Sequence, residues 1–428
     1  MHPDSARRLV HAQPGVAIEY EQPLELFSMP GLPPRGPASG AYTRGILVSD
    51  ATTGAPIPGV DVYGLDAGMA QRTQTNGKGH ATVRAHAGIL SEVVISPRHG
   101  YWSRVLRQLP MGVEGQTRVS LEPLPVHGDY SWGHRFMGFD QVNRRWKGRG
   151  VRVGIIDTGI STQEADVHPA GGLNTVSEAA PRSWNLDDEG HGTHCAGIVA
   201  SLHDERGVRG GAPEAEIYSL KVFPGGQLSD LLEAVEWCIQ HRIDVVTMSL
   251  GSVWPSRALT DAMGHGYARG ITFIAAAGNH ASRVAFPAAN PWTIAVGAFG
   301  RHGTFPDDSA HVRQIGWNHD RSGQVFAAGF SNYGPEIDVC APGVAILSTV
   351  PGGYAAWDGT SMACPLVTAL VALILEASPS IRTGDWRQPH AVRQILRYAS
   401  SDLGLPPLVQ GHGVPFAPLA LGGRTRLH

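Results

Sequence analysis

Residues 151–159, VRVGIIDTG, join an apolar run to an acidic residue at its end. A continuous apolar run is typical of a strand that is buried on both faces of a parallel sheet. Similar runs occur at residues 217–222, 245–248, 271–277 and 293–296, and helical patterns at 230–242 and 257–269 lie between them. This alternation predicts an α/β fold with a mostly parallel sheet and helices on both faces. We expect its ligand site beyond the carboxyl ends of the strands.

Three separated segments carry the residue types that acyl-transfer chemistry needs. They are IIDTG at residues 155–159, GHGTH at 190–194 and GTSMA at 359–363. Asp157 would accept a hydrogen bond from His191, and His191 would act as the base toward Ser361. An aspartic protease also uses Asp-Thr-Gly, but it needs two copies and this chain has one. The pattern therefore predicts an acid, a base and a nucleophile in that order along the chain.

The order and the residues around it resemble the subtilisin-like serine protease (subtilase) family. Further matching stretches are MSLG at residues 248–251, AAAGN at 275–279, FPA at 286–288, FSNYGP at 330–335 and APG at 341–343. The resemblance extends over residues 132–421, about two thirds of the chain. It implies a subtilisin-like sheet and an Asp-His-Ser catalytic triad of Asp157, His191 and Ser361.

The resemblance also implies roles for residues outside the triad. Asn279 would donate from its side-chain amide to the oxyanion, with a simple turn former as the alternative. Loss of one such donor costs about 3 to 4 kcal/mol of transition-state stabilisation, a magnitude known from a subtilisin. His280 follows where the family often has glycine, so we expect an altered pocket floor. The implied substrate-binding residues form two segments: Ser249, Leu250, Gly251 and Ser252, and Ala276, Ala277 and Gly278.

No cofactor is predicted to be required, and no metal-binding residue is assigned. His191 and His194 lie three residues apart, but no further ligand cluster accompanies them. We expect the acidic residues 187–189 to form a solvated turn, with a structural calcium site as the alternative. Cys195 and Cys364 lie near the proposed catalytic residues. We expect them to pack as small apolar side chains, with a reactive thiol as the alternative.

The region before the predicted sheet divides into two parts. Residues 1–40 end in a proline- and glycine-rich stretch, so we expect a flexible arm there. Residues 41–125 contain short β-prone runs at 45–48, 60–63, 81–84 and 92–95, which predict a small β-sandwich domain. It resembles the regulatory sandwich beside some carboxypeptidases. Residues 126–422 would form the catalytic domain, and residues 423–428 a tail.

The chain lacks the two amphipathic helices expected of a subtilase propeptide. The small domain therefore either replaces that propeptide or serves as an accessory domain. In either case we expect it to contact the catalytic domain or another protein.

The composition of the chain limits the classes of partner that we expect. The chain has 34 basic and 37 acidic residues, a formal charge of −3, so nothing in its composition suggests nucleic acid binding. The apolar stretch at residues 366–375 is shorter than the roughly 20 residues that cross a bilayer, so we expect a buried core helix and no membrane span. No secretory signal peptide is visible in the sequence, which favours a cytoplasmic location.

Together these features predict a serine endopeptidase that hydrolyses polypeptides through an acyl-enzyme. A peptide transferase or ligase would share the same residues and differ only in the acceptor of the acyl group. A non-catalytic binding module on a protease fold is the second alternative.

Overall fold

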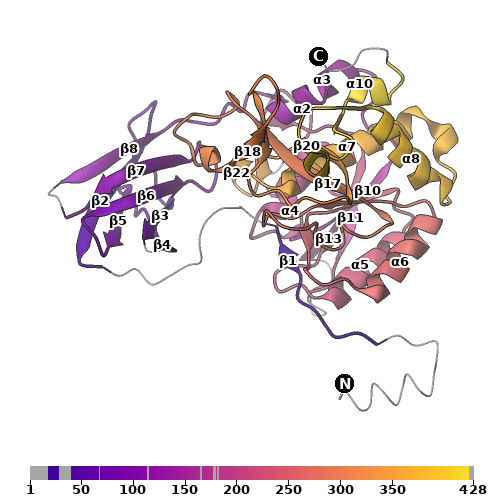
Figure 1. Cartoon of the computed structure of the whole chain (residues 1–428), viewed down its shortest axis with the longest axis horizontal. Coiled ribbons are helices and arrows are strands. Elements are labelled where there is room, and N and C mark those ends of the chain that lie inside the picture. Colours follow the sequence, from indigo (N-terminus) through magenta and orange to yellow (C-terminus); the bar gives the residue numbers. More distant parts are fainter. Residues whose placement is uncertain are drawn as a thin grey trace.

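The computed structural model describes residues 18–27, 40–66, 68–112, 115–163, 166–176, 180 and 183–423. Its centre is a nine-stranded sheet in the order β11-β13-β10-β14-β16-β17-β19-β18, with β20 paired to β17 (Figure 1). The strands are β10 (Arg152–Asp157), β11 (Gly171–Asn174), β13 (Glu216–Lys221), β14 (Val245–Met248), β16 (Thr272–Ala276), β17 (Thr293–Arg301), β18 (Ile315–His319), β19 (Val325–Ala328) and β20 (Ile337–Pro342).

Most of this sheet is parallel, as the apolar runs predict. From β11 across to β17, and from β17 to β20, every pairing is parallel. Only the two pairings of β19, with β17 and with β18, are antiparallel, and they lie at the far edge. Strand β10 lies in the interior between β13 and β14, and five of its six residues are buried. Its carboxyl end delivers Asp157 to the edge where the site was predicted.

Helices cover both faces of the sheet. On one face α4 (His191–Ala200), α7 (Thr360–Ala377) and α8 (Arg387–Tyr398) pack in one hydrophobic core. On the other face α5 (Leu228–Gln240) and α6 (Arg257–Ala268) pack in a second core. Short helices complete the domain: α2 (Trp132–Phe136), α3 (Phe139–Val142), α9 (Pro407–Gln410) and α10 (Ala417–Ala420).

Helix α7 is apolar on all sides, which is typical of a helix enclosed by protein. It is the one helix among the described residues that is long and apolar enough to cross a membrane, and 89% of it is buried. It contacts β14, β16, β17 and β20. The predicted core helix is therefore present, and it extends beyond the apolar stretch at residues 366–375 in both directions, from Thr360 to Ala377.

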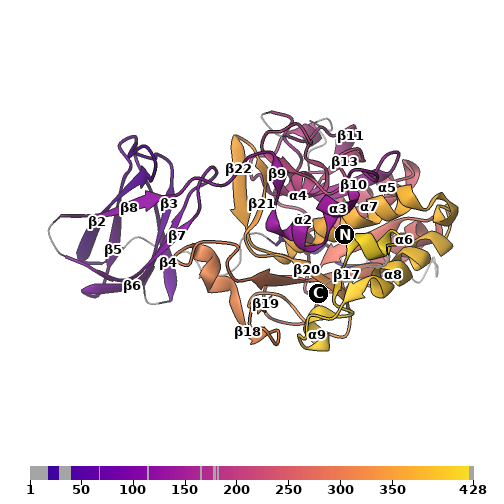
Figure 2. The same cartoon turned by 90° about the horizontal axis from the view of Figure 1, so that it is seen from above.

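Two small sheets form a separate lobe N-terminal to the main sheet (Figure 2). Their orders are β5-β2-β8 and β4-β3-β6-β7. The strands are β2 (Tyr42–Asp50), β3 (Asp61–Asp66), β4 (Met69–Gln74), β5 (His80–Ala85), β6 (Ile89–Ser96), β7 (Arg104–Pro110) and β8 (Gln116–Leu121). Three of the four predicted runs lie within these strands, and the fourth, at 60–63, begins one residue before β3. Strands β4, β7 and β8 were not predicted. All pairings are antiparallel except β2 with β8.

The small lobe contacts the main domain through β6, β7 and the segment between them. Backbone hydrogen bonds join Val105 N to Asp308 O and Gly100 N to Tyr354 O, both at 2.7 Å. Trp102 packs edge-on against His311, with ring centroids 5.6 Å apart. Glu92 forms an ion pair with Arg313. The lobe therefore abuts the hairpin of β21 (Ile346–Val350) and β22 (Gly353–Trp357).

Short strands complete the structure, and one of them comes from the predicted arm. They are β1 (Glu25–Leu26), β9 (Asp129–Tyr130), β12 (Val208–Arg209), β15 (Leu250–Gly251), β23 (Ser400–Ser401) and β24 (Val414–Pro415). Strand β1 pairs antiparallel with β15 of the main domain. A flexible arm was predicted at residues 1–40 and a tail at residues 423–428. Of these, residues 1–17, 28–39 and 424–428 lie outside the described residues.

The burial of α7 gives a stability prediction. Leu370 is fully buried, so Leu370→Ala leaves a cavity and lowers the free energy of unfolding by about 2 to 5 kcal/mol. Denaturant unfolding measures this in a Ser361→Ala background, which removes the proposed nucleophile. Leu408→Ala is the matched control, because Leu408 is 49% exposed and the change there is expected to stay within about 0.5 kcal/mol. Equal losses at both positions would contradict the assigned packing.

Candidate active site

Asp157 and His191 are brought together by a strand end and a helix start. Asp157 ends β10, and His191 begins α4. His191 Nδ1 donates a 2.7 Å hydrogen bond to Asp157 Oδ1, and both side chains are buried. His191 Nε2 has no hydrogen-bond partner within the described residues. The acid therefore fixes the proton on Nδ1 and leaves Nε2 as the ring nitrogen that can take up a proton.

Glycine allows the helix to approach the strand end this closely. A Cβ atom on Gly192 would lie 2.1 Å from Gly159 O and 3.1 Å from Asp157 Cβ. Gly192 N instead donates to Thr158 Oγ1 at 2.8 Å. A larger residue at position 192 would therefore push His191 away from Asp157.

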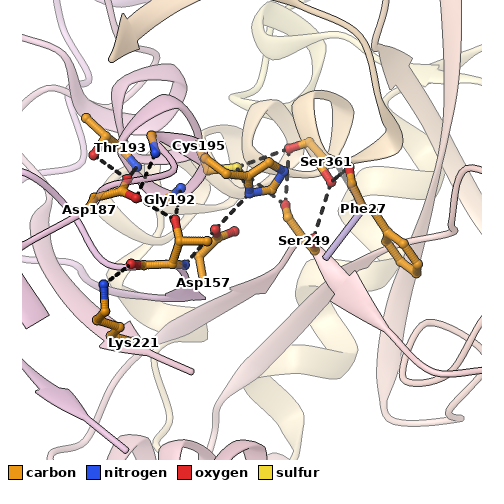
Figure 3. Close-up of polar contacts among 12 residues, drawn as sticks. Phe27, Asp157, Asp187, Gly192, Thr193, Cys195, Lys221, Ser249 and Ser361 are labelled. Atoms are coloured by element: carbon orange, nitrogen blue, oxygen red, sulfur yellow. Dashed lines mark hydrogen bonds and ion pairs between the residues drawn. The ribbon is translucent and has the colours of Figure 1, made fainter. Parts of the chain in front are cut away.

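Asp187 braces the loop that precedes His191. Its two carboxylate oxygens accept four hydrogen bonds, from Thr158 Oγ1, Gly190 N, Thr193 N and Thr193 Oγ1, at 2.6 to 2.9 Å (Figure 3). Asp187 is buried, so the prediction of a solvated turn is wrong for this residue. Asp188 and Glu189 are exposed, as expected for such a turn. Because Asp187 uses its oxygens on the protein, its role is to hold the start of α4 beside Thr158.

The charge on Asp157 sets the electrostatics of His191. Burial lowers the pKa of His191, but the charge of Asp157 and the hydrogen bond between the two side chains outweigh burial and hold it well above its usual value. At the neighbouring His194, burial dominates and lowers the pKa to about 3. The His194 ring stacks on Trp357 with centroids 4.6 Å apart. His194 is therefore a neutral packing residue.

Ser361 lies in the first turn of α7, next to a carbonyl of the N-terminal segment. Ser361 Oγ donates to Phe27 O at 2.9 Å and lies 3.3 Å from Ser249 O (Figure 3). No hydrogen bond joins Ser361 to His191, the residue predicted to act as its base, among the described residues. The Ser361 hydroxyl is therefore directed to the carbonyl oxygens of Phe27 and Ser249 in this structure.

Asn279 holds the same carbonyl from another direction. Asn279 Nδ2 donates to Phe27 O at 3.0 Å. Asn279 Oδ1 accepts from Thr360 N at 2.9 Å and from Thr360 Oγ1 at 2.8 Å, which fixes the orientation of the amide. A Cβ on Gly359 would lie 3.2 Å from Asn279 Nδ2 and 3.5 Å from Phe27 O, so glycine keeps this approach open. The carbonyl oxygen of Phe27 therefore accepts hydrogen bonds from the side chains of both Ser361 and Asn279.

The predicted substrate-binding residues divide into two sets. Leu250 and Gly251 pair with Leu26 and Glu25, and Ser249 O accepts from Phe27 N at 3.4 Å. Ser252 pairs instead with Phe286. In the other segment, the backbone N–H of Ala277 donates to Val296 O, that of Gly278 donates to Thr360 Oγ1, and Ala276 is fully buried in β16. The structure thus brings residues 249–251 against residues 25–27.

Three parts of this site were not predicted from the sequence. One is Phe27, which comes from the predicted arm. The second is the pair Gly226 and Gln227, which contacts the N-terminal segment on the side away from residues 249–251. Leu24 N donates to Gly226 O at 2.9 Å, and Gln227 forms an isolated β-bridge with Pro23. The third is Thr360, whose position in GTSMA could have suggested a supporting role. No local signal marks the other residues, because their contacts join parts of the chain that are separated by between 202 residues, as for Leu24 and Gly226, and 334 residues, as for Phe27 and Ser361.

One group of possible metal ligands occurs within the described residues: Asp157, His191 and Cys195, whose ligand atoms lie within 4.8 Å of one another. Asp157 and His191 already bond each other directly. Burial raises the pKa of Cys195, which keeps its thiol protonated and a poor ligand, and it raises that of Cys364 to about 12. Both cysteines are fully buried. These contacts fit packing behind the acid–imidazole pair better than a metal centre.

Comparison with known proteins gives one consistent family. The sequence model of the subtilase family matches residues 148–414. Over 268 residues the chain is 38% identical to subtilisin DY of Bacillus licheniformis, covering 60% of this chain and 86% of that protein. It is 40% identical over 245 residues to a subtilisin of Bacillus pumilus, covering 55% and 80%. It is 35% identical over 292 residues to a thermostable alkaline protease of Halalkalibacterium halodurans, covering 67% and 72%.

The coupling of Asp157 to His191 can be measured directly. Asp157→Asn removes the charge that stabilises the imidazolium, so the pKa of His191 should fall from well above 6.5. NMR titration of isotope-labelled histidine measures this value. Asp188→Asn, an exposed change in the neighbouring turn, should leave it unchanged. An unaltered His191 pKa in Asp157→Asn would show that the two side chains do not interact as described.

Proposed function

Because the chain belongs to the subtilase family, we propose that Asp157, His191 and Ser361 form its catalytic triad and that Asn279 stabilises the oxyanion. The family and the relatives make the chain a subtilisin-like serine endopeptidase, an enzyme that acts on polypeptides. What remains to be proposed is which residues perform each step and how a substrate lies.

One observation carries this assignment. The backbone carbonyl of Phe27 accepts hydrogen bonds from Ser361 Oγ at 2.9 Å and from Asn279 Nδ2 at 3.0 Å. This carbonyl stands in for the one that a substrate presents to the enzyme. A nucleophile and an oxyanion donor that meet on one peptide carbonyl support acyl transfer at that carbon.

The proposed reaction has two halves. Ser361 Oγ attacks the substrate carbonyl carbon while its proton passes to His191 Nε2. The imidazolium is stabilised by Asp157, which holds Nδ1 at 2.7 Å. His191 then protonates the departing amine, and an ester remains on Ser361. In the second half His191 takes a proton from water, the water oxygen attacks the ester, and the acid product leaves with Ser361 restored.

We also propose that substrates bind as a strand between two segments of the enzyme. The contacts of residues 24–27 support this, with Gly226 on one side and residues 249–251 on the other. Backbone pairing of this kind gives affinity without much demand on side chains. The side chains that enter pockets then set what preference the enzyme has.

Ser361→Ala should abolish peptide hydrolysis and preserve the fold, because it deletes one hydroxyl from the first turn of α7. The expected loss in kcat is about 10⁶-fold, a magnitude known from a subtilisin. Hydrolysis of a chromogenic peptide and near-ultraviolet circular dichroism measure the two effects. Ser322→Ala, in an exposed turn, is the matched control and should keep full activity. Substantial hydrolysis by folded Ser361→Ala would refute the assigned nucleophile.

Asn279→Ala should lower kcat by about 10²- to 10³-fold, since it removes one donor to the developing oxyanion. KM should change much less, because the donor acts mainly in the transition state. Steady-state kinetics separate the two constants. Asn76→Ala, in a turn of the small N-terminal lobe, provides the comparison and should match the parent enzyme. A variant at Asn279 that raises KM and keeps kcat would indicate a role in ground-state binding instead.

A further inference from the structure

The small N-terminal lobe contacts two segments of the main domain that lead to the proposed triad. One is β22, the strand that faces the lobe in Figure 2, where Gly100 N donates to Tyr354 O at 2.7 Å. The other is the 3-10 helix Ala310–Gln314, whose first N–H donates to Ser103 Oγ at 3.1 Å. One of these segments packs on the proposed base, and the other holds the residues before the proposed nucleophile.

Trp357, the last residue of β22, packs on both histidines at the start of α4. Its ring stacks on that of His194, with centroids 4.6 Å apart and planes 10° apart, and on that of His191, with centroids 6.3 Å apart and planes 23° apart. His194 Nε2 also donates to Ala355 O of the same strand at 3.1 Å. The lobe therefore supports the strand that packs on the imidazole of His191.

A second buried pair of a carboxylate and an imidazole lies before the nucleophile. His311 Nδ1 donates to Asp358 Oδ1 at 2.7 Å, and the two side chains are 4% and 7% exposed. The same oxygen accepts from Ala345 N at 2.7 Å. Because Asp358 precedes Ser361 by three residues, these two bonds fix the backbone that leads into the first turn of α7.

Trp102 of the small lobe holds the His311 ring in this orientation. The two rings meet edge to face, with centroids 5.6 Å apart and planes 87° apart, and Phe305 contacts the imidazole at the same centroid distance. His311 Nε2 is buried and has no hydrogen-bond partner within the described residues. The direction of the imidazole toward Asp358 therefore depends on one hydrogen bond and on the aromatic rings around it.

We propose that Trp102, His311 and Asp358 are positioning residues through which the small lobe holds Ser361 in place for catalysis. This proposal rests on the proposed function of the site. The nucleophile must meet the substrate carbonyl carbon and His191 with little tolerance, and a misplacement of about 1 Å can cost roughly 10²-fold in rate. Of the two roles expected for the lobe, this one makes it an accessory domain that raises the rate of hydrolysis.

The first test changes the ring that the lobe supplies. Trp102→Ala should lower kcat for a chromogenic peptide by roughly 10- to 10²-fold and leave KM near the parent value, because the nucleophile is displaced and substrate binding is not. The value of kcat is expressed per serine labelled by a fluorophosphonate, so unfolded molecules do not contribute. Trp102→Phe keeps a ring and should recover most of kcat. Trp317→Ala, at a fully exposed side chain, is the matched control and should equal the parent.

The second test changes the hydrogen bond between the imidazole and the carboxylate. His311→Phe keeps a ring but removes the donor to Asp358, so kcat should fall over the same range. His311→Asn places an amide N–H close to the position of Nδ1 and should recover part of the loss. His86→Phe is the matched control, because His86 forms a 2.8 Å pair with Asp66 on the exposed surface of the lobe, and kcat should not change there.

A purely structural role for these residues gives a different result. In that case the melting temperature of Trp102→Ala would fall while kcat per labelled serine and the rate of fluorophosphonate labelling stayed at the parent values, and the proposal would be overturned. An increase in KM at constant kcat would overturn it too, since it would place the effect on substrate binding. If His311→Phe yields no folded protein, the two variants at Trp102 decide between these outcomes.

Ser361→Ala, assayed beside these variants, separates the two proposals. If Ser361→Ala is inactive while Trp102→Ala and His311→Phe equal the parent enzyme, the positioning proposal is wrong and the proposed function stands. If folded Ser361→Ala hydrolyses the peptide as the parent does, the assigned nucleophile is wrong, and the positioning proposal fails with it.

Discussion

The hydrogen bond between Asp157 and His191 is the contact on which the active site depends. It requires the carboxyl end of an interior strand and the first residue of a helix to approach within 2.7 Å in a buried environment. Gly192 permits the approach, and Asp187 holds the loop between the two elements. Burial alone would favour a neutral imidazole, as at His194, so the charge of Asp157 is what makes His191 able to accept a proton.

Much of this arrangement could be predicted because it is encoded locally. Buried strands have continuous apolar sequences, so Val245–Met248 was predicted to the residue. Asp157, His191 and Ser361 sit at element ends that glycine and apolar runs mark. In the small lobe β7 and β8 escaped prediction, because exposed polar residues such as Arg107 and Arg118 interrupt their patterns. Asp187 was also misjudged, since three neighbouring acidic residues suggest solvent and give no sign of the donors around one of them.

The occupied groove could not be predicted, since it depends on pairings between distant parts of the chain. Residues 18–27 have neither a helical pattern nor a long strand pattern. Their order comes from the main domain, which supplies Gly226 on one side, Leu250 on the other, and polar groups for Glu19, Glu21 and Glu25. The same backbone contacts that would hold a foreign peptide hold this one. On the proposed substrate arrangement, the surface that would bind a foreign peptide is the one that contacts residues 24–27.

A crystal structure of the Ser361→Ala protein would show whether these contacts exist. We expect Phe27 O to lie within hydrogen-bond distance of Asn279 Nδ2, residues 24–26 to pair between Gly226 and Leu250, and His191 Nδ1 to contact Asp157. A groove without this segment would contradict the contacts of residues 24–27, and a separated Asp157 and His191 would contradict the active site itself.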